Sequence, residues 1–227
     1  MKILGVIPAR GGSKGVKRKN LRLVAGKPLI AYSIEAAQHA RSLTRFVVST
    51  EDDEIAAAAR SLGAEVIARP KEIAEDTTPM VDVLEHAFRC VEERGDTFDV
   101  GLILQPTAPL RTSEDIDAAI EQFRNSAATS LVSVYQVSDC HPARMYTCEK
   151  GVLIPLAEEP KQRLRQALSP VFHRNGAIYL FRSSLLREGR LIGDHPLAFV
   201  MPREVSLNID EEIDLDLADL LVRRRVT

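Results

Sequence analysis

The stretch IPARGGSKGVKRKN, residues 7–20, joins the end of an apolar run to a glycine-rich turn that is crowded with cations. The run that leads into it, KILGVIP, is short, rich in β-branched residues and nearly continuous, which is typical of a strand buried on both faces. From Met1 to Ile34 the chain has eight lysines and arginines and no aspartate or glutamate. The first predicted strand therefore ends in a loop that suits an anion.

The segments that follow this loop predict a regular alternation of helices and strands. Apolar residues at helical spacing predict helices, and short apolar runs predict strands. The expected strands are residues 2–8, 45–50, 64–70, 98–107, 130–137, 176–181 and 197–202, and the expected helices are residues 28–42, 51–63, 80–94, 114–124 and 211–225. This order predicts an α/β fold with a doubly wound, mainly parallel sheet.

One region breaks the alternation, and we expect it to leave the sheet. Prolines at positions 142, 155, 160 and 170 interrupt any regular helix or strand there. We therefore interpret residues 139–174 as a small excursion within a single domain that spans residues 1–227.

Composition argues against several classes of protein. The formal net charge is −2 and the chain has no tryptophan, which disfavours a protein whose main role is to bind nucleic acid. The first apolar run is too short to span a membrane. The three cysteines form no C-x-x-C pair, so we interpret them as reduced thiols and expect a cytoplasmic protein.

The glycine-rich loop matches neither of the two common phosphate-binding patterns. A Walker A loop requires a second glycine five residues after the first, and Val16 stands five residues after Gly11. A dinucleotide-binding loop requires a glycine where this chain has Ser13. An ordinary solvated turn is the alternative. We favour an anion site, because the cations gather at the carboxyl end of a strand, where open α/β sheets bind ligands.

The stretch at residues 7–20 also resembles the opening motif of the sugar-activating cytidylyltransferases, the CMP-N-acylneuraminate (CMP-sialic acid) synthetase family. Further stretches follow in the order of that family, namely VVSTEDDEIA, RPKEIAEDT, LQPTAPLRT, HP at 141–142, NGAIYLF and NIDEEIDL. The resemblance covers nearly the whole chain. It implies a Rossmann-like nucleotidyltransferase in which a sugar hydroxyl attacks the α-phosphate of CTP and releases pyrophosphate.

The resemblance implies roles for residues around the triphosphate. Arg10 and Lys19 would stabilise the charge that develops in the reaction, and with Asp210 they are the expected catalytic residues. The expected nucleotide-binding residues are Arg10, Gly11, Ser13, Lys19, Asn20 and Arg69. For Arg69, an ordinary surface arginine before a turn is the alternative.

A second set of residues is implied for the acidic sugar. The expected sugar-binding residues are Gln105, Arg165, Asn175 and Tyr179, with Gln166 beside Arg165. A guanidinium holds a carboxylate through two parallel hydrogen bonds, and a carboxamide orients hydroxyl groups. Strand alternation predicts that residues 175, 177 and 179 share one face. His141 and His173 are interpreted as structural.

The stretch NIDEEIDL implies a site for Mg²⁺, the expected cofactor. The family pattern commonly has Asp-x-Asp here, whereas this chain has Asn208 before Asp210. Asp210 is the expected metal ligand, and the neutral Asn208 leaves open whether a second ligand or a second ion takes part. A helix N-cap is the alternative role for Asp210. Asp214 and Asp216 are expected to face solvent.

Several alternatives stay open. The expected acceptor is a nine-carbon N-acylneuraminate, and legionaminic, pseudaminic or 3-deoxy-octulosonic acid would undergo the same reaction. A catalytically silent nucleotide-sugar-binding module is the alternative of another class. No side chain is identified as a general base. The resemblance also implies a homodimer formed through the excursion, from which Arg144 or Arg165 would act on a neighbouring active site.

Overall fold

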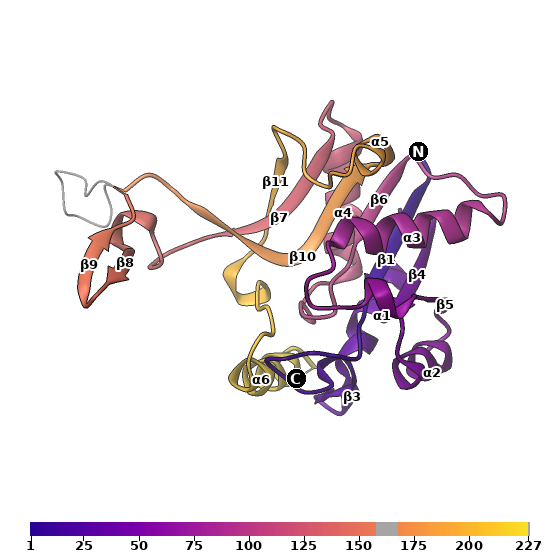
Figure 1. Ribbon diagram of the computed structural model, residues 1–227, viewed down its shortest axis with the longest axis horizontal. Coiled ribbons are helices and arrows are strands. Elements are labelled where there is room, and N and C mark those ends of the chain that lie inside the picture. The colour runs from indigo at the N-terminus through magenta and orange to yellow at the C-terminus, as the bar shows by residue number, and fades with distance from the viewer. Residues whose placement is uncertain (158–167, 227) are drawn as a thin grey trace.

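The computed structural model describes residues 1–157 and 168–226, and its centre is a seven-stranded sheet in the order β11-β7-β10-β6-β1-β4-β5 (Figure 1). The strands are β1 (Ile3–Pro8), β4 (Arg45–Thr50), β5 (Glu65–Ala68), β6 (Val100–Ile103), β7 (Ser130–Gln136), β10 (Phe172–Arg182) and β11 (Leu197–Val200). β10 is antiparallel to both of its neighbours, and the other pairs are parallel. The prediction of an α/β fold with a mainly parallel sheet is confirmed.

Helices cover both faces of this sheet. α1 (Leu29–His39), α2 (Asp53–Ser61) and α4 (Ser113–Arg124) pack on one face, and α3 (Met80–Glu92) and the unpredicted α5 (Ser183–Arg187) pack on the other. β1 has no polar face because Ile3 and Ile7 enter the first core while Leu4 and Val6 enter the second. In the part of the chain that the structure describes, no helix is both long and apolar enough to cross a membrane.

The last helix, α6 (Glu212–Val226), packs against the loop that follows β1. Leu215, Ala218 and Val222 of α6 share an apolar cluster with Val16 of that loop. The short strands β2 (Leu23–Val24) and β3 (Lys27–Pro28) form a hairpin beside it. Short 3₁₀ turns lie at η1 (Lys19–Leu21), η2 (Lys71–Ile73), η3 (Pro142–Arg144) and η5 (Arg203–Val205). Packing between the two ends of the sequence therefore covers the carboxyl edge of β1.

The chain leaves the sheet between β7 and β10. There β8 (Tyr146–Glu149) and β9 (Val152–Pro155) form a separate antiparallel hairpin, and every residue in these two strands is exposed. Figure 1 shows this hairpin well away from the sheet, at the end of two extended segments. The expected end of the excursion at Arg174 was too late, because β10 begins at Phe172 and Arg174 already pairs with Val134 of β7.

β10 contains an irregularity that the sequence pattern did not predict. Its register against β7 shifts between Arg174 and Tyr179, and Gly176 has a φ of +73°. Ala177 packs in the core beneath α1 and α4, whereas Tyr179 packs against the core beneath α3. The prediction that residues 175, 177 and 179 share one face is therefore wrong, because the irregularity interrupts the two-residue alternation.

Candidate active site

The loop after β1 is held in shape by its own side chains. The Ser13 hydroxyl donates to the carbonyl oxygen of Val16 at 2.5 Å and accepts from the backbone N–H of Lys19 at 3.0 Å. The Asn20 carboxamide is buried and donates to the carbonyl oxygen of Arg10 at 2.9 Å. Ser13 and Asn20 thus shape the loop, whichever ligand it receives. The prediction that they also contact a nucleotide stays a prediction.

The same loop is fastened to the segment that precedes α6. The Lys19 ammonium donates to the carbonyl oxygen of Ile209 at 2.6 Å and lies 3.5 Å from Oδ1 of Asp210. Gly15 packs directly against the carbonyl group of Asp210, and a Cβ at this position would overlap it. Residues 190 positions apart in the sequence therefore form one wall of the site.

Two carboxylates that the sequence interpretation did not single out also hold this loop. Arg10 and Lys14 both form ion pairs with Asp76, and the hydrogen bond from Lys14, together with the charge of Arg10, lowers the pKa of Asp76. Glu51 accepts the backbone N–H of Gly11 at 2.7 Å. Both acids stand inside stretches on which the family resemblance rests, RPKEIAEDT and VVSTEDDEIA, and that is the signal that points to them.

A cavity of about 450 Å³ opens beside the loop. It brings together four of the six residues expected to bind the nucleotide and three predicted site residues from elsewhere in the chain. Its predicted members are Arg10, Ser13, Lys19, Asn20, Gln105, Asn208 and Asp210. Three cations, Arg10, Lys14 and Lys19, contribute to its walls, so it suits a ligand with several negative charges. We call this cavity the basic cavity.

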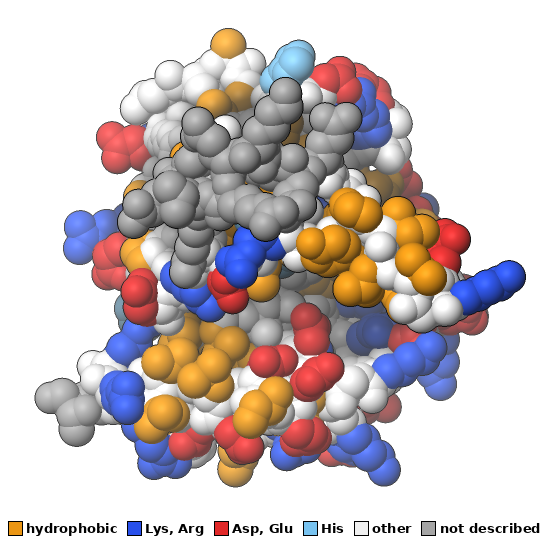
Figure 2. All heavy atoms as spheres, turned by 90° about the vertical axis from the view of Figure 1, so that its left-hand side faces the viewer, with side chains coloured by type: hydrophobic (Ala, Val, Ile, Leu, Met, Phe, Trp, Pro, Cys, Tyr) orange, Lys and Arg blue, Asp and Glu red, His pale blue; other side chains and the backbone are white. Residues whose placement is uncertain are grey.

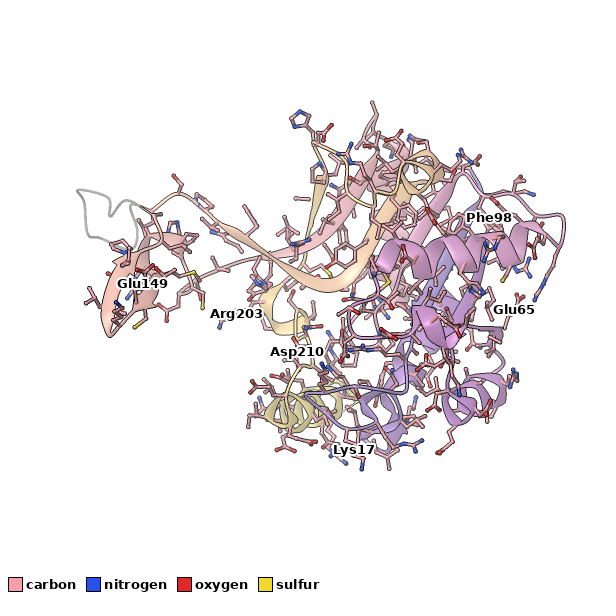
Figure 3. All side chains as sticks on the ribbon, viewed as in Figure 1. Lys17, Glu65, Phe98, Glu149, Arg203 and Asp210 are labelled. Atoms are coloured by element: carbon pink, nitrogen blue, oxygen red, sulfur yellow. The ribbon has the colours of Figure 1, made fainter. Side chains whose placement is uncertain are left out.

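A second cavity, of about 600 Å³, adjoins the first. Gln105, Asn208 and Asp210 line both, so these three residues mark the junction. Its other walls come from β7, β10, η5 and α6, and include Tyr135, His173, Arg174, Asn175, Tyr179 and Arg203. The rings of Tyr135 and His173 pack against each other at 5.6 Å between centroids. We call this space the second cavity, and Figure 3 shows Arg203 and Asp210 on the segment that borders it.

The two predicted sugar-binding residues of β10 differ in whether their polar groups already have hydrogen-bond partners. The Asn175 carboxamide is buried, accepts from the hydroxyl of Ser133 at 2.6 Å and donates to that of Ser206 at 2.9 Å. Its polar atoms therefore already connect β7, β10 and η5. Tyr179 is half-buried, and burial raises its pKa. The sequence pattern did not identify Arg203, Tyr135 or the ring of His173 as walls of this cavity.

Two buried arginines lie outside the cavity walls. Arg69 donates to the hydroxyl of Ser49 at 3.1 Å and to its carbonyl oxygen at 2.5 Å, and burial lowers the pKa of Arg69. Arg111 donates to the carbonyl oxygens of Ala177 at 2.9 Å and Gln105 at 3.2 Å, and burial lowers its pKa to about 10. Arg111 thereby ties the Gln105 loop to β10, and the buried position of Arg69 disagrees with a surface arginine.

The excursion carries the remaining predicted residues. Arg144 forms an exposed ion pair with Asp139 at 2.9 Å and lines a separate space at the base of the excursion. His141 accepts the backbone N–H of Ala143 at 3.1 Å, which is a structural role. Arg165 and Gln166 lie outside the described residues.

Among the residues that the structure describes, Asp210 is the one carboxylate at the cavity junction. Its oxygens meet Lys19 at 3.5 Å and the Asn208 amide nitrogen at 2.6 Å rather than helix N–H groups, so the N-cap alternative is wrong. Asp214 accepts the N–H groups of Asp210 and Glu211 instead and is half-buried, while Asp216 is exposed as expected. Within the described ranges no group of three His, Cys, Asp or Glu side chains could hold a metal ion. A single carboxylate beside a basic cavity fits Mg²⁺ only if substrate phosphates and water complete its ligands.

Comparison with known proteins identifies the family. Residues 4–195 match the family model described as Cytidylyltransferase. The chain belongs to the cytidylyltransferase family. The chain is 28% identical over 99% of its length to the N-acylneuraminate cytidylyltransferase of Escherichia coli, of which it spans 53%. It is 31% identical to the pseudaminic acid cytidylyltransferase of Campylobacter jejuni, with 98% of this chain and 97% of that protein covered. It is 34% identical to the CMP-N,N'-diacetyllegionaminic acid synthase of Legionella pneumophila, with 96% and 94% covered.

A solved structure supports the fold of this chain. The CTP complex of CMP:2-keto-3-deoxy-manno-octonic acid synthetase superposes with a TM-score of 0.75 over 99% of this chain and 100% of that one, at 18% identity. The Rossmann-like nucleotidyltransferase fold that the family resemblance implied is thus confirmed. The chain spans about half the length of the Escherichia coli relative and nearly all of the Campylobacter and Legionella ones.

Proposed function

We propose that this chain transfers the CMP group of CTP to a hydroxyl of an acidic keto-sugar and releases pyrophosphate. The observation that carries the proposal is the pair of adjoining cavities, one lined by cations and one by polar and aromatic side chains, which share Gln105, Asn208 and Asp210. A reaction between a triphosphate and a sugar needs two such spaces that meet at the reacting atoms.

The residues of the basic cavity suit the chemistry of nucleotidyl transfer. Such a reaction depends mainly on the placement of its reactants and on the stabilisation of charge that spreads over phosphate oxygens. Lys19 and Arg10 would supply that stabilisation, and Lys19 is pre-positioned because its ammonium is held by the carbonyl oxygen of Ile209. Gly11, Ser13 and Asn20 would give the loop the shape that lets its backbone approach the phosphates.

We further propose that the acceptor is a nine-carbon acid of the N-acylneuraminate type. The names of the relatives support this class, since they specify N-acylneuraminate, pseudaminic acid and diacetyllegionaminic acid. The second cavity supports an acidic sugar, because Arg174 and Arg203 line it and a guanidinium binds a carboxylate. Pseudaminic, legionaminic and 3-deoxy-octulosonic acids are the alternative acceptors.

The deciding experiment is a panel of sugars. The chain is incubated with CTP, Mg²⁺ and N-acetylneuraminic, legionaminic, pseudaminic or 3-deoxy-octulosonic acid, and pyrophosphate is measured. We expect release to be fastest with N-acetylneuraminic acid and to require CTP rather than ATP, GTP or UTP. Absence of pyrophosphate with every sugar, while calorimetry still detects CTP binding, would indicate a nucleotide-sugar-binding module instead.

We propose Mg²⁺ as the cofactor, with Asp210 as the ligand from the protein. When bound, the ion would neutralise phosphate charge, and Asp210 stands 3.5 Å from Lys19 at the mouth of the basic cavity. Asp210→Asn is expected to raise the Mg²⁺ concentration for half-maximal activity by about tenfold or more. Asp216→Asn, at an exposed position in α6, is the matched control and should leave it unchanged. A lowered melting temperature with unchanged Mg²⁺ dependence would remove Asp210 from the metal site.

We also propose that two copies of the chain associate through the β8–β9 hairpin. Val152, Leu153 and Ile154 are 64%, 63% and 40% exposed, and none of the described residues of this hairpin belongs to a buried cluster. A two-stranded hairpin is only marginally stable alone, and exposed apolar patches of this kind mark protein contacts. Arg144 or Arg165 would then stand close to the neighbouring copy's cavities.

A further inference from the structure

Asn208 stands at the junction of the two cavities, at a position where the related motif commonly has aspartate. Its amide nitrogen donates to Oδ2 of Asp210 at 2.6 Å, and this hydrogen bond fixes which way the carboxamide points. Its carbonyl oxygen Oδ1 is buried and has no hydrogen-bond partner. A buried acceptor without a partner is costly to a folded protein, and it indicates that a donor is supplied from elsewhere.

The surroundings of this oxygen specify where that donor would lie. Asn208 and Gln105 both line the two cavities. A Cβ built on Gly176 would lie 2.7 Å from Oε1 of Gln105 and 3.2 Å from Oδ1 of Asn208, so both amide oxygens pack against this glycine. Gly176, whose φ is +73°, has no side chain that would displace them. Two neutral acceptors thus lie close together on the wall of one small volume at the junction.

The chemistry of this volume favours a hydroxyl group. Both oxygens are neutral. The nearest carboxylate, that of Asp210, already contacts Asn208 and Lys19, so these two oxygens lack the negative charge that a divalent cation requires. We propose that Oδ1 of Asn208 accepts a hydrogen bond from a hydroxyl of the sugar and orients it toward the basic cavity, while the amide nitrogen holds Asp210 in place. This inference rests on the proposed function, since it places the acceptor of that reaction. Because a carboxamide does not take up a proton, Asn208 orients the hydroxyl without acting as its base.

Two substitutions test the acceptor oxygen and the donor nitrogen of the Asn208 amide separately. Asn208→Leu keeps the size of the side chain and removes both the acceptor and the donor. Asn208→Asp keeps an acceptor and removes the donor to Asp210. Asn125→Leu, at an exposed helix end far along the chain, controls for the same change of residue elsewhere. For each variant, kcat and KM are measured with N-acetylneuraminic acid, or with the panel sugar that reacts fastest, and the Kd for CTP is measured by calorimetry.

We expect Asn208→Leu to lower kcat/KM for the sugar by about 10- to 100-fold, because the sugar hydroxyl loses its acceptor in a buried place. The Kd for CTP and the melting temperature should stay near those of the unaltered chain, and Asn208→Asp should keep kcat/KM for the sugar within about tenfold. If Asn208 had only a structural role, Asn208→Leu would lower the melting temperature, and the change in kcat/KM for the sugar would not exceed the change in CTP affinity.

Three results would overturn the inference. One is an unchanged kcat/KM for the sugar in Asn208→Leu. Another is a loss of CTP affinity as large as the loss for the sugar, which would place Asn208 on the phosphate side. The third is an Asn208→Asp variant as impaired as Asn208→Leu, which would assign the effect to the donor. If the unaltered chain reacts with no sugar, the proposed function itself fails, and that outcome is distinct from these three.

Discussion

Two short strands of this chain are similarly apolar, but one is buried and the other is exposed. VGLI in β6 is buried at every residue, whereas VLIP in β9 is exposed at every residue. β6 lies at the centre of the seven-stranded sheet between two layers of helices, while β9 pairs with β8 in a separate two-stranded sheet. Figure 2 shows apolar side chains gathered on the face that carries the hairpin.

The same contrast separates the cavities from the excursion. Around the cavities, polar groups are held by specific partners, as Asn175 is by Ser133 and Ser206 and Lys19 is by Ile209. On the hairpin, the β-ladder is the main contact among the described residues. The comparison teaches that an apolar pattern predicts a strand but not the surface that covers it. Under the proposed function, changes in the cavities would alter the reaction and changes in the hairpin would alter association.

The largest expected effect tests the cavity side of this comparison. Lys19→Ala should lower kcat by roughly 10²–10³-fold, because the residue's proposed task is to stabilise charge in the transition state. The melting temperature should change little by comparison. Lys17→Ala, at an exposed position in the same loop, is the control and should retain activity. Pyrophosphate release and calorimetric melting are the measurements, and an unchanged kcat would remove Lys19 from the site.

The second prediction tests the hairpin side. Ile154→Asp should weaken dimerisation by roughly 30-fold or more, since it places a charge in the centre of an apolar contact. Sedimentation at micromolar concentration is the measurement, with Leu23→Asp as the control. Leu23 is 65% exposed but lies in β2, far from the hairpin. If Ile154→Asp and the unaltered chain sediment alike, the hairpin does not join two copies.

The third prediction concerns two glycines in the same loop. A Cβ on Gly15 would overlap the carbonyl group of Asp210, whereas a Cβ on Gly12 would meet nothing within 4 Å. Gly15→Ala should therefore lower the stability by about 1–3 kcal/mol, and the melting temperature by roughly 2–4 °C for each kcal/mol. It should also raise KM for CTP, because the loop separates from the segment before α6. Equal melting temperatures for Gly15→Ala and Gly12→Ala would contradict this contact.

The smallest expected effect depends on pH. The pKa of Asp76 is lowered in the folded chain, so its contribution to stability is present above the unfolded-state value of about 3.9 and is lost as the pH falls through the lower folded-state value. The melting temperature of Asp76→Asn should therefore lie below that of the unaltered chain at pH 6, and the difference should shrink in more acidic buffer. A difference that stays constant from pH 6 into strongly acidic buffer would show that the ion pairs with Arg10 and Lys14 contribute nothing.

Much of the fold was predictable from local pattern. Every predicted strand and helix outside the excursion is present, with ends that differ by a few residues. The irregularity in β10 was not predictable, because its effect depends on the register against β7. The hairpin of β2 and β3 and the helix α5 were missed because each is too short to show a periodic pattern.

Some residues of the candidate site could likewise be predicted from the sequence, and others could not. The glycine-rich loop and the order of its motifs identified Arg10, Lys19, Gln105 and Asp210, which the structure places around the basic cavity. Asp76 and Glu51 were not singled out, because an acidic residue shows its partner only when the chain has folded. Asn208 was assigned only as a doubtful metal ligand, and its unpartnered oxygen is a property of the folded surroundings.

The sequence by itself determined the alternation of strands and helices and the concentration of cations near one end, because both depend on residues close together along the chain. Only the tertiary structure decided that α6 closes over the first loop and that two cavities share Gln105, Asn208 and Asp210. These contacts join residues more than a hundred positions apart. Their existence depends on packing and on hydrogen bonds between distant segments, and no local pattern encodes which distant segment will be the partner.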